Sequence, residues 1–373
     1  MHSIFLSCVA AALLLACPAV AREQPQGSAD APFRVAVAGL SHGHVDGFFG
    51  HYLKRPDVQV VGIYEEDAGV AERAAARMKL DKALMYADLD EMLAKSLPHA
   101  VIVCTSTADH RAVIEKCAAR GVHVMVEKPL AIGMEDARAI EKAAKAGNIH
   151  LLVNYETTWY RSGRAAYDLV KSGALGEVRK IVAHHGHNGP KEIGCGTDFL
   201  AWLTDPKENG SGALHDFGCY GADLATWIMQ GERPTSVMAV TQRMKPHMYP
   251  HVDDEATIVV TYPKAQLIIQ ASWNWPFSRK DIEVYGERGS VVTVADGAVR
   301  VRRPGENAEK QVEARAIDAP ENDPITYFRA VVLDGLKPWG PSSLDTNITV
   351  MEILGAASES AMTGKRVPLE LAR

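Results

Sequence analysis

The stretch Phe33–His44, FRVAVAGLSHGH, decides the fold. It begins as an apolar run of strand character and enters a turn that starts at Gly39 and contains Gly43. Strands of a parallel sheet covered on both faces are nearly continuous apolar runs, and their ligands bind beyond the carboxyl ends. A glycine turn between a strand and a helix also exposes backbone N–H groups that suit a phosphate. The stretch therefore predicts the first strand of a nucleotide-binding sheet.

The same rhythm continues as far as residue 155. Further strand-like runs cover 58–65, 99–105, 122–127 and 149–155, and helical patterns separate them over 44–55, 68–78, 110–119 and 135–145. Alternation of buried strands with amphipathic helices is typical of a doubly wound parallel sheet. We therefore predict an α/β Rossmann domain over 33–155.

Beyond residue 156 the rhythm changes. Helical patterns cover 162–172, 213–229, 324–334 and 345–363, and several strand patterns follow one another between 236 and 302. Sequential strands joined by short turns indicate antiparallel pairing. We predict a second, α+β domain over 156–373 with a large, mostly antiparallel open sheet that serves substrate binding and oligomerisation.

The N-terminus has the pattern of an export signal. Ile4–Val20 is rich in Ala and Leu and leads into a small-x-small pattern, which predicts a signal peptide over 1–21 and a polar linker over 22–32. The run is too short and too rich in Ala for a comfortable transmembrane span. A competing interpretation takes Leu14–Cys17 as a lipobox, with a lipid anchor at Cys17. Both predict an exported bacterial protein, either periplasmic or an outer-surface lipoprotein.

The composition is that of an ordinary globular protein. The 373 residues are 47 % hydrophobic and 23 % charged, which leaves room for two domains. A formal net charge of −6 provides no basic surface for nucleic acid, so that class of partner is excluded. Outside the signal region, Cys104 and Cys117 fall on apolar faces and are expected in the core. Whether Cys195 and Cys219 pair is left open.

Polar residues at the ends of the predicted strands indicate a dinucleotide. Glu65 ends the second strand, where an acid accepts a hydrogen bond from the ribose 2′-OH of NAD and repels the 2′-phosphate of NADP. We therefore predict NAD and disfavour NADP. Ser41 stands where a full glycine fingerprint would have its second glycine. Further cofactor contacts are expected at Gly39, Ser41, His42, Gly43, Thr105, Ser106 and His110.

A lysine ends another predicted strand, in the stretch Val122–Ala131, VHVMVEKPLA. Pro129 fixes its own φ and disfavours the helical conformation of Lys128, so a stiff turn presents the ammonium at the ligand-binding edge of the sheet. Lys128 is therefore the candidate for the chemistry. The alternative is an ordinary connection with a solvated lysine.

With these residues assembled, the chain resembles the Gfo/Idh/MocA family, named for glucose-fructose oxidoreductase and inositol dehydrogenase. The motifs that carry the resemblance are the glycine turn, Glu65, Thr105–His110, Glu127-Lys128-Pro129, Gly173–Val178 and, most specifically, GSGALHDFGCYGAD over 210–223. It covers nearly everything from Phe33 to the C-terminus. It implies an NAD(P)-dependent oxidoreductase that acts on a sugar, polyol or related carbohydrate and self-associates as a homo-oligomer.

The resemblance also implies a catalytic set. Lys128 is expected to contact the nicotinamide region and the reacting hydroxyl, and Asp216 and Tyr220 to complete the site. Tyr220 replaces the His of the family's Asp-x-x-x-His motif, as in the glucose-fructose oxidoreductase and dihydrodiol dehydrogenase branches. On a helix, Asp216 and Tyr220 share a face. A neighbouring lysine ammonium is expected to bring the pKa of Tyr220 down toward a useful range.

Other residues are assigned more loosely. By position in the resemblance, Glu127 and Asn154 are expected at the cofactor, and the substrate at Tyr155, Tyr160, Arg161 and His187. His185 and His187 share a strand face, but no further ligand is identifiable near these histidines, so we predict no metal. Trp273 and Trp275 fit either a sugar-stacking platform or the core.

The expected reaction is reversible hydride transfer, with Tyr220 exchanging the hydroxyl proton and Lys128 stabilising the alkoxide. Export conflicts with a cytoplasmic nicotinamide pool, so the cofactor is expected to be held through many turnovers. Two alternatives are kept. One is an NAD-dependent glycoside hydrolase or epimerase that uses transient oxidation, and the other is a non-catalytic nucleotide- or sugar-binding protein.

Overall fold

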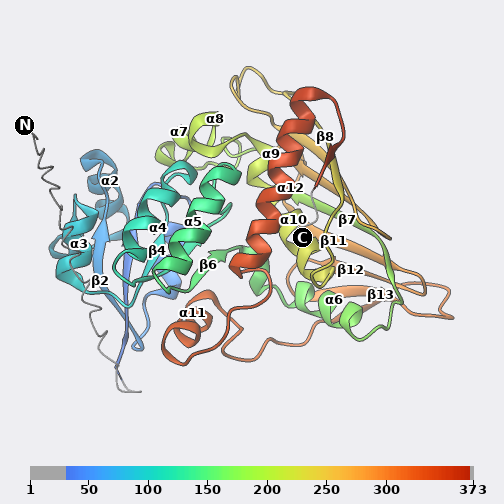
Figure 1. The fold of residues 1–373 in the computed structure, drawn as a ribbon, viewed down its shortest axis with the longest axis horizontal. Helices are drawn as coiled ribbons and strands as arrows, with labels where there is room; N and C mark the ends of the chain where they lie inside the picture. The colour runs from blue at the N-terminus through green and yellow to red at the C-terminus, as the bar shows by residue number, and fades with distance from the viewer. Residues whose placement is uncertain (1–30, 370–373) are drawn as a thin grey trace, which may run out of the picture. The chain divides into compact units, whose positions relative to one another are not determined.

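The computed structural model describes residues 31–369 (Figure 1). The predicted signal peptide, the anchor at Cys17 and nearly all of the predicted linker lie outside the described residues. None of the helices in the described part is long and apolar enough to cross a membrane.

A six-stranded parallel sheet forms the first half of the chain, in the order β3-β2-β1-β4-β5-β6. Its strands are β1 (Phe33–Ala38), β2 (Val58–Tyr64), β3 (Met85–Tyr86), β4 (Ala100–Val103), β5 (His123–Glu127) and β6 (Leu151–Asn154). Their side chains are largely buried on both faces, as continuous apolar runs require. The predicted doubly wound Rossmann sheet is confirmed.

Helices pack on this sheet between the strands: α1 (Val45–Gly47), α2 (Ala68–Met78), α3 (Leu89–Ser96), α4 (His110–Ala118) and α5 (Met134–Ala146). Short helical turns cover Lys82–Leu84 (η2) and Thr107–Asp109 (η3). The helix predicted over 44–55 is instead the single turn α1 followed by the π-helical η1 (Phe48–Tyr52). The sequence prediction also missed β3, which has only two residues, and α3, which Asp88 caps through the backbone N–H of Glu91.

A nine-stranded mixed sheet forms the second half, in the order β14-β13-β12-β11-β7-β10-β9-β8-β15. Only β7 and β10 pair in parallel; the other neighbours are antiparallel, as predicted. The strands are β7 (Val178–Gly186), β8 (Ser236–Gln242), β9 (Glu255–Thr261), β10 (Gln266–Ser272), β11 (Arg279–Gly286), β12 (Ser290–Val294), β13 (Ala298–Arg302), β14 (Lys310–Glu313) and β15 (Val367–Pro368). The predicted α+β half with a mostly antiparallel sheet is confirmed.

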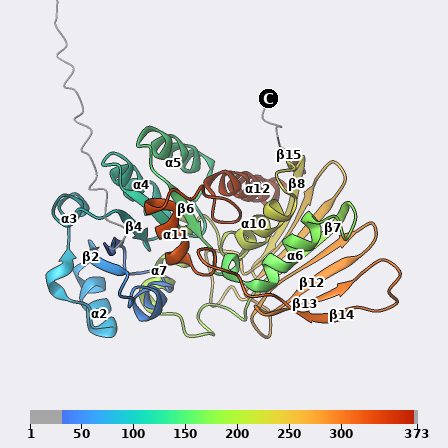
Figure 2. The ribbon, with the colours of Figure 1, turned by 90° about the horizontal axis from the view of Figure 1, so that it is seen from below.

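Helices cover one face of this second sheet (Figure 2). The helical elements of this half are η4 (Glu156–Trp159), α6 (Arg161–Lys171), α7 (Thr197–Leu203), α8 (Pro206–Asn209), α9 (Ala213–Asp216), α10 (Gly218–Ile228), α11 (Pro324–Leu333) and α12 (Leu344–Thr363). The continuous helix predicted over 213–229 is wrong in one respect. It breaks at Phe217, whose backbone (φ −112°, ψ −24°) separates α9 from α10.

One hydrophobic cluster joins the two sheets, and a second cluster covers the other face of the first sheet. A single cluster of buried side chains runs from Val126 and Val153 of the first sheet to Tyr220 and Leu224 of α10 and Leu354 of α12. Helix α12 lies between the halves and contacts both α5 and β8 (Figure 1). The carboxyl edge of the first sheet therefore faces α9 and α10 across packed side chains, and the candidate site is built there.

Candidate active site

Lys128 and Asp216 form a buried ion pair between the two halves. Lys128 directly follows β5. Its Nζ lies 2.6 Å from Asp216 Oδ1 and 3.2 Å from the backbone oxygen of Asp216. Burial alone would lower the pKa of Lys128, but the Asp216 carboxylate outweighs it and holds the pKa above its ordinary value. In the same way, burial raises the pKa of Asp216 while Lys128 brings it below normal. Both side chains are therefore charged at neutral pH.

The second oxygen of Asp216 is also occupied. Trp273 Nε1 donates a hydrogen bond of 2.9 Å to Asp216 Oδ2, and Trp273 is fully buried. Trp273 therefore orients the Asp216 carboxylate and does not form a sugar-stacking surface. The sequence offered no signal for this contact, because the two residues meet only through the packing of α9 on β10.

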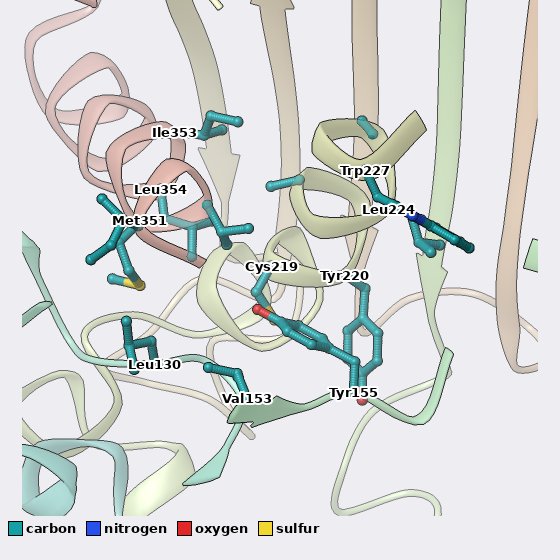
Figure 3. Packing of buried hydrophobic residues seen from close by; sticks show 14 of the residues in the cluster. Leu130, Val153, Tyr155, Cys219, Tyr220, Leu224, Trp227, Met351, Ile353 and Leu354 are labelled. Atoms are coloured by element: carbon teal, nitrogen blue, oxygen red, sulfur yellow. The ribbon is translucent and has the colours of Figure 1, made fainter. Parts of the chain in front are cut away.

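Tyr220 lies beside the pair, and its ring packs against that of Tyr155 below α10 (Figure 3). The Lys128 ammonium is 5.1 Å from the centroid of the Tyr220 ring. The expected lowering of the pKa of Tyr220 is wrong. Burial, and after it the nearby Glu156 carboxylate, raises that pKa well above 10. Tyr220 is therefore a neutral phenol at ordinary pH.

Glu127 stands at the centre of a second buried network. Its Oε1 accepts a hydrogen bond of 2.8 Å from Asn154 Nδ2, and its Oε2 lies 3.0 Å from His44 Nδ1. Asn154 in turn accepts from Trp159 Nε1 at 3.1 Å. Burial would raise the pKa of Glu127, but His44, His42 and Asn154 together bring it down to about 2. This network holds the turn that carries Lys128.

A polar cleft of about 290 Å³ opens at the carboxyl edge of β1, β2 and β4. Five of the predicted cofactor residues line it: Gly39, Ser41, Glu65, Thr105 and Ser106. Glu65 accepts hydrogen bonds from the backbone N–H of Leu40 and of Asp67 at 2.8 and 3.1 Å. These bonds hold an acceptor at the end of β2, where a ribose hydroxyl would be read. The cleft therefore fits the adenosine half of NAD.

Gly39 is required by the geometry of this cleft. Its φ of +88° belongs to the left-handed region, and a Cβ there would lie 2.6 Å from the backbone nitrogen of Thr105. Gly43, later in the turn, has only the ring of Phe199 nearby, 3.6 Å from where a Cβ would stand.

A segment of the second half, α7–α8 (Thr197–Asn209), is fastened beside the cleft. Arg73 of α2 pairs with Asp198 of α7 at 2.6 Å, and Ser106 Oγ lies 3.0 Å from Glu208 Oε2. Phe199 also packs on the glycine turn. The sequence prediction missed both helices, and so missed that a part of the second half borders the cofactor site.

The predicted histidines divide between core and site. His42 is 2 % exposed, and His110 directs Nδ1 to the backbone oxygen of Leu130 at 3.2 Å, so neither lines the cleft. Burial lowers the pKa of His110 to about 4, which makes it a neutral packing residue. The ring of His187 lies edge-on to that of Phe217, with centroids 4.9 Å apart, next to the Lys128–Asp216 pair.

The three other predicted substrate residues have partners of their own. The prediction that Tyr155 binds substrate is not supported by its position, since it is fully buried and donates a hydrogen bond of 2.9 Å to Asn347 Oδ1. Tyr160 donates to Glu156. Arg161 lies 3.8 Å from Asp296, at the turn between β12 and β13.

Cysteines and metal-type clusters add little to the site. The four cysteines in the described part, Cys195 and Cys219 among them, are free thiols. His184 has the acidic neighbours that the sequence could not reveal, Asp281 and Glu283 on β11. This group lies on the opposite face of β7 from His185 and Tyr220, and Arg279 engages the Asp281 carboxylate through two bonds of 2.9 and 2.6 Å.

Comparison with known proteins agrees with this fold. A family model described as "Oxidoreductase family, NAD-binding Rossmann fold" matches residues 33–155, and the model of the GFO/IDH/MocA C-terminal domain matches 164–292. The chain is 25 % identical over 211 residues to human trans-1,2-dihydrobenzene-1,2-diol dehydrogenase, and 28 % identical over 190 residues to the Xenopus laevis enzyme. These matches cover 57 % and 50 % of this chain, and 59 % and 53 % of the relatives.

Solved structures share the fold over most of the chain. Aldose-aldose oxidoreductase from Caulobacter crescentus, complexed with glycerol, has a TM-score of 0.76 at 22 % identity and covers 91 % of this chain and 100 % of its own. An inositol dehydrogenase homologue from Azotobacter vinelandii, complexed with NAD⁺, has a TM-score of 0.76 at 21 % identity, with coverage of 91 % and 98 %. The two family models together match more than half of the residues, and the chain belongs to the Gfo/Idh/MocA family of oxidoreductases with an NAD-binding Rossmann domain.

Proposed function

We propose that the protein is an NAD-dependent oxidoreductase that acts on a hydroxyl-bearing carbon of a sugar, polyol or related carbohydrate. The observation that carries the proposal is the buried Lys128–Asp216 ion pair beside Tyr220, at the carboxyl edge of the family's NAD-binding sheet. The related proteins support the substrate class, because their names refer to a dihydrodiol, an aldose and inositol.

The chain has the groups that NAD needs. Gly39, Ser41, Thr105 and Ser106 would hold its adenosine and phosphate parts in the cleft, with Glu65 at the ribose. When bound, NAD supplies the hydride acceptor or donor for the substrate carbon.

The residues beside the cofactor site divide the remaining work. Lys128 Nζ places a positive charge where the substrate oxygen becomes negative, and Asp216 holds that ammonium in position. Tyr220 Oη, protonated because of its raised pKa, gives its proton to the substrate oxygen in the reducing direction. The phenolate that this step leaves then takes the hydroxyl proton of the next substrate as that substrate is oxidised. Lys128, Asp216 and Tyr220 are each at most 5 % exposed, so bulk water is excluded from these steps.

Export and retention of the cofactor belong to the same proposal. The apolar N-terminal run supports export, and an exported enzyme has no cytoplasmic nicotinamide pool to draw on. Retention is supported by the α7–α8 segment, because its bonds to Arg73 and Ser106 would have to open before a cofactor in the cleft could leave past it. Each cycle would then oxidise one substrate and reduce another.

We also propose that the protein self-associates through the uncovered face of the second sheet. Met238 and Val240, which share this face on β8, are 46 % and 58 % exposed, and exposed apolar side chains of this kind favour burial against a second copy. Light scattering of the full chain should give a mass above that of one copy, and a monomer at all concentrations would refute it.

The test of the function is the nicotinamide absorbance of protein purified without added cofactor. The proposal predicts bound NAD, and a signal that rises when a polyol such as myo-inositol or an aldose is added and falls when an oxidised sugar follows. Lys128→Met should retain NAD but lose turnover by a factor of about 10³, whereas Lys142→Met, at an exposed position on α5, should be unaffected. Normal turnover by Lys128→Met would refute the assignment.

A further inference from the structure

A second lysine lies beside Tyr220, on an element far from Lys128. Lys280 of β11 has its Nζ 5.1 Å from the centroid of the Tyr220 ring, the same distance as Lys128 Nζ. The sequence prediction did not identify it, because its position follows from the pairing of Lys280 with His185 across β11 and β7. That register places Lys280 on the face of the sheet that carries His185 and packs against Tyr220 of α10.

Lys280 is held in place by an acid from the other half. Glu156, in η4 just after β6, pairs through Oε2 with Lys280 Nζ and accepts the hydroxyl of Tyr160 on Oε1. The residue before it, Tyr155, packs its ring edge-on against Tyr220 at 5.4 Å. One short stretch thus fixes both the ring of Tyr220 and the cation beside it.

We propose that Glu156 and Lys280 are positioning residues that act through Tyr220. In this inference, which rests on the proposed function, they hold the phenol in place and set how readily its hydroxyl exchanges a proton with the substrate. Neither is assigned a contact with substrate or cofactor.

The charges around Tyr220 explain why this pair matters. The titratable groups that face it are Glu127 and Lys128 at the end of β5, Tyr155 after β6, Glu156 on η4, His185 on β7, Asp216 on α9, Cys219 on α10 and Lys280 on β11. Asp216 already neutralises Lys128. After burial, Glu156 is the leading cause that raises the pKa of Tyr220, and Lys280 is the ammonium that offsets Glu156.

These charges determine the direction in which each substitution shifts the midpoint of Tyr220 ionisation. Glu156→Gln removes a negative charge and leaves Lys280, so the phenolate becomes easier to form and the midpoint of Tyr220 ionisation should fall by about one pH unit. Lys280→Met leaves Glu156 unbalanced, so the midpoint should rise by a similar amount. The double variant should lie between the two, and Lys280→Arg, which keeps the charge, should stay near the wild type.

The experiment reads Tyr220 directly, without turnover. The full chain is labelled with 3-fluorotyrosine, whose ortho fluorine lowers phenol pKa values in all variants alike, and Tyr220→Phe assigns the resonance. Fluorine NMR then follows that resonance against pH in the wild type, Glu156→Gln, Lys280→Met, the double variant and Lys280→Arg.

The inference predicts that Glu156→Gln ionises at the lowest pH and Lys280→Met at the highest, or not at all within the range where the fold survives. Coincident midpoints, the reverse order, or a resonance that moves in none of the proteins would overturn it. If the order holds but no carbohydrate is turned over, the proposed function fails and the inference about Tyr220 stands. If turnover is normal and the midpoints coincide, the inference about Tyr220 fails and the proposed function stands.

Discussion

Two buried carboxylates flank Lys128, and they are kept charged by different neighbours. Asp216 forms an ion pair with Lys128 and accepts a hydrogen bond from Trp273. Among the described residues, no lysine or arginine pairs with Glu127, which contacts Asn154 and His44 instead. In the proposed function Asp216 takes part in the chemistry, whereas Glu127 stabilises the turn that presents Lys128. The two roles can be separated by their dependence on pH.

Glu127 should make the stability of the fold sensitive to acid. Its pKa in the folded protein is about 2, below the 4.5 of a free glutamate, so its contribution is complete above about pH 4.5 and is lost as the pH falls toward 2. The shift corresponds to about 3 kcal/mol. Urea unfolding should show that the free energy of unfolding of the wild type exceeds that of Glu127→Gln at pH 7. The difference between these two free energies should shrink in acid.

The matched control for this experiment is Glu135→Gln, because the side chain of Glu135 is 94 % exposed at the start of α5. Its free energy of unfolding should follow that of the wild type at every pH. A difference between the wild type and Glu127→Gln that stays constant from pH 7 to pH 2 would mean that Glu127 is not the ionised centre of its network.

At the scale of elements, the cofactor cleft depends on how closely β1 and β4 approach. Gly39→Ala would place a Cβ against the backbone that follows β4, 2.6 Å from Thr105 N and 2.7 Å from Cys104 C. The substituted residue would also have to keep the positive φ of Gly39. Thermal unfolding should show a loss of roughly 2 kcal/mol or more, with weakened NAD binding.

Gly47→Ala is the matched control for that substitution. Gly47 has a helical backbone (φ −65°, ψ −42°), and nothing lies within 4 Å of a Cβ placed there. The change should therefore be neutral or stabilise the protein by about 0.5–1 kcal/mol. Equal losses for the two variants would contradict the close approach at Gly39.

The α7–α8 segment makes a separate prediction about cofactor release. Asp198→Asn removes the ion pair with Arg73, and an exposed pair of this kind contributes little because solvent screens the two charges. NAD should therefore leave up to about fivefold faster when retained cofactor is chased with an excess of a competing nucleotide. Lys95→Met, which breaks an exposed pair on α3, is the control. Identical release rates in Asp198→Asn and the wild type would refute retention by this segment.

At the scale of the whole molecule, what the sequence could predict depended on how local the signal was. The alternation of apolar runs predicted both sheets, and the glycine turn, Glu65 and the Lys128 turn lie at the carboxyl edge where strand ends must lie. Contacts made by long-range packing were out of reach: Trp273 on Asp216, Glu208 on Ser106, and Lys280 beside Tyr220.

The errors have the same physical origin. Tyr155 follows a strand end, as a ligand-binding residue would, but it is buried in the core beside α10 and α12. Its hydroxyl donates a hydrogen bond to Asn347. The pKa of Tyr220 was expected to fall beside a lysine, but that lysine is already paired with Asp216, and burial dominates. In both cases the outcome depends on a further residue, Asn347 or Asp216, whose proximity the sequence does not show.

In the proposed function, Lys128, Asp216 and Tyr220 serve a hydride transfer between a carbohydrate carbon and NAD. It is tested most directly by incubating the purified protein with a polyol that carries deuterium on its carbinol carbons and weighing the extracted cofactor by mass spectrometry. The reduced cofactor should gain one deuterium in the wild type and in Lys142→Met, and none in Lys128→Met. Deuterium gained equally by Lys128→Met, or by none of the proteins with any sugar or polyol, would contradict it.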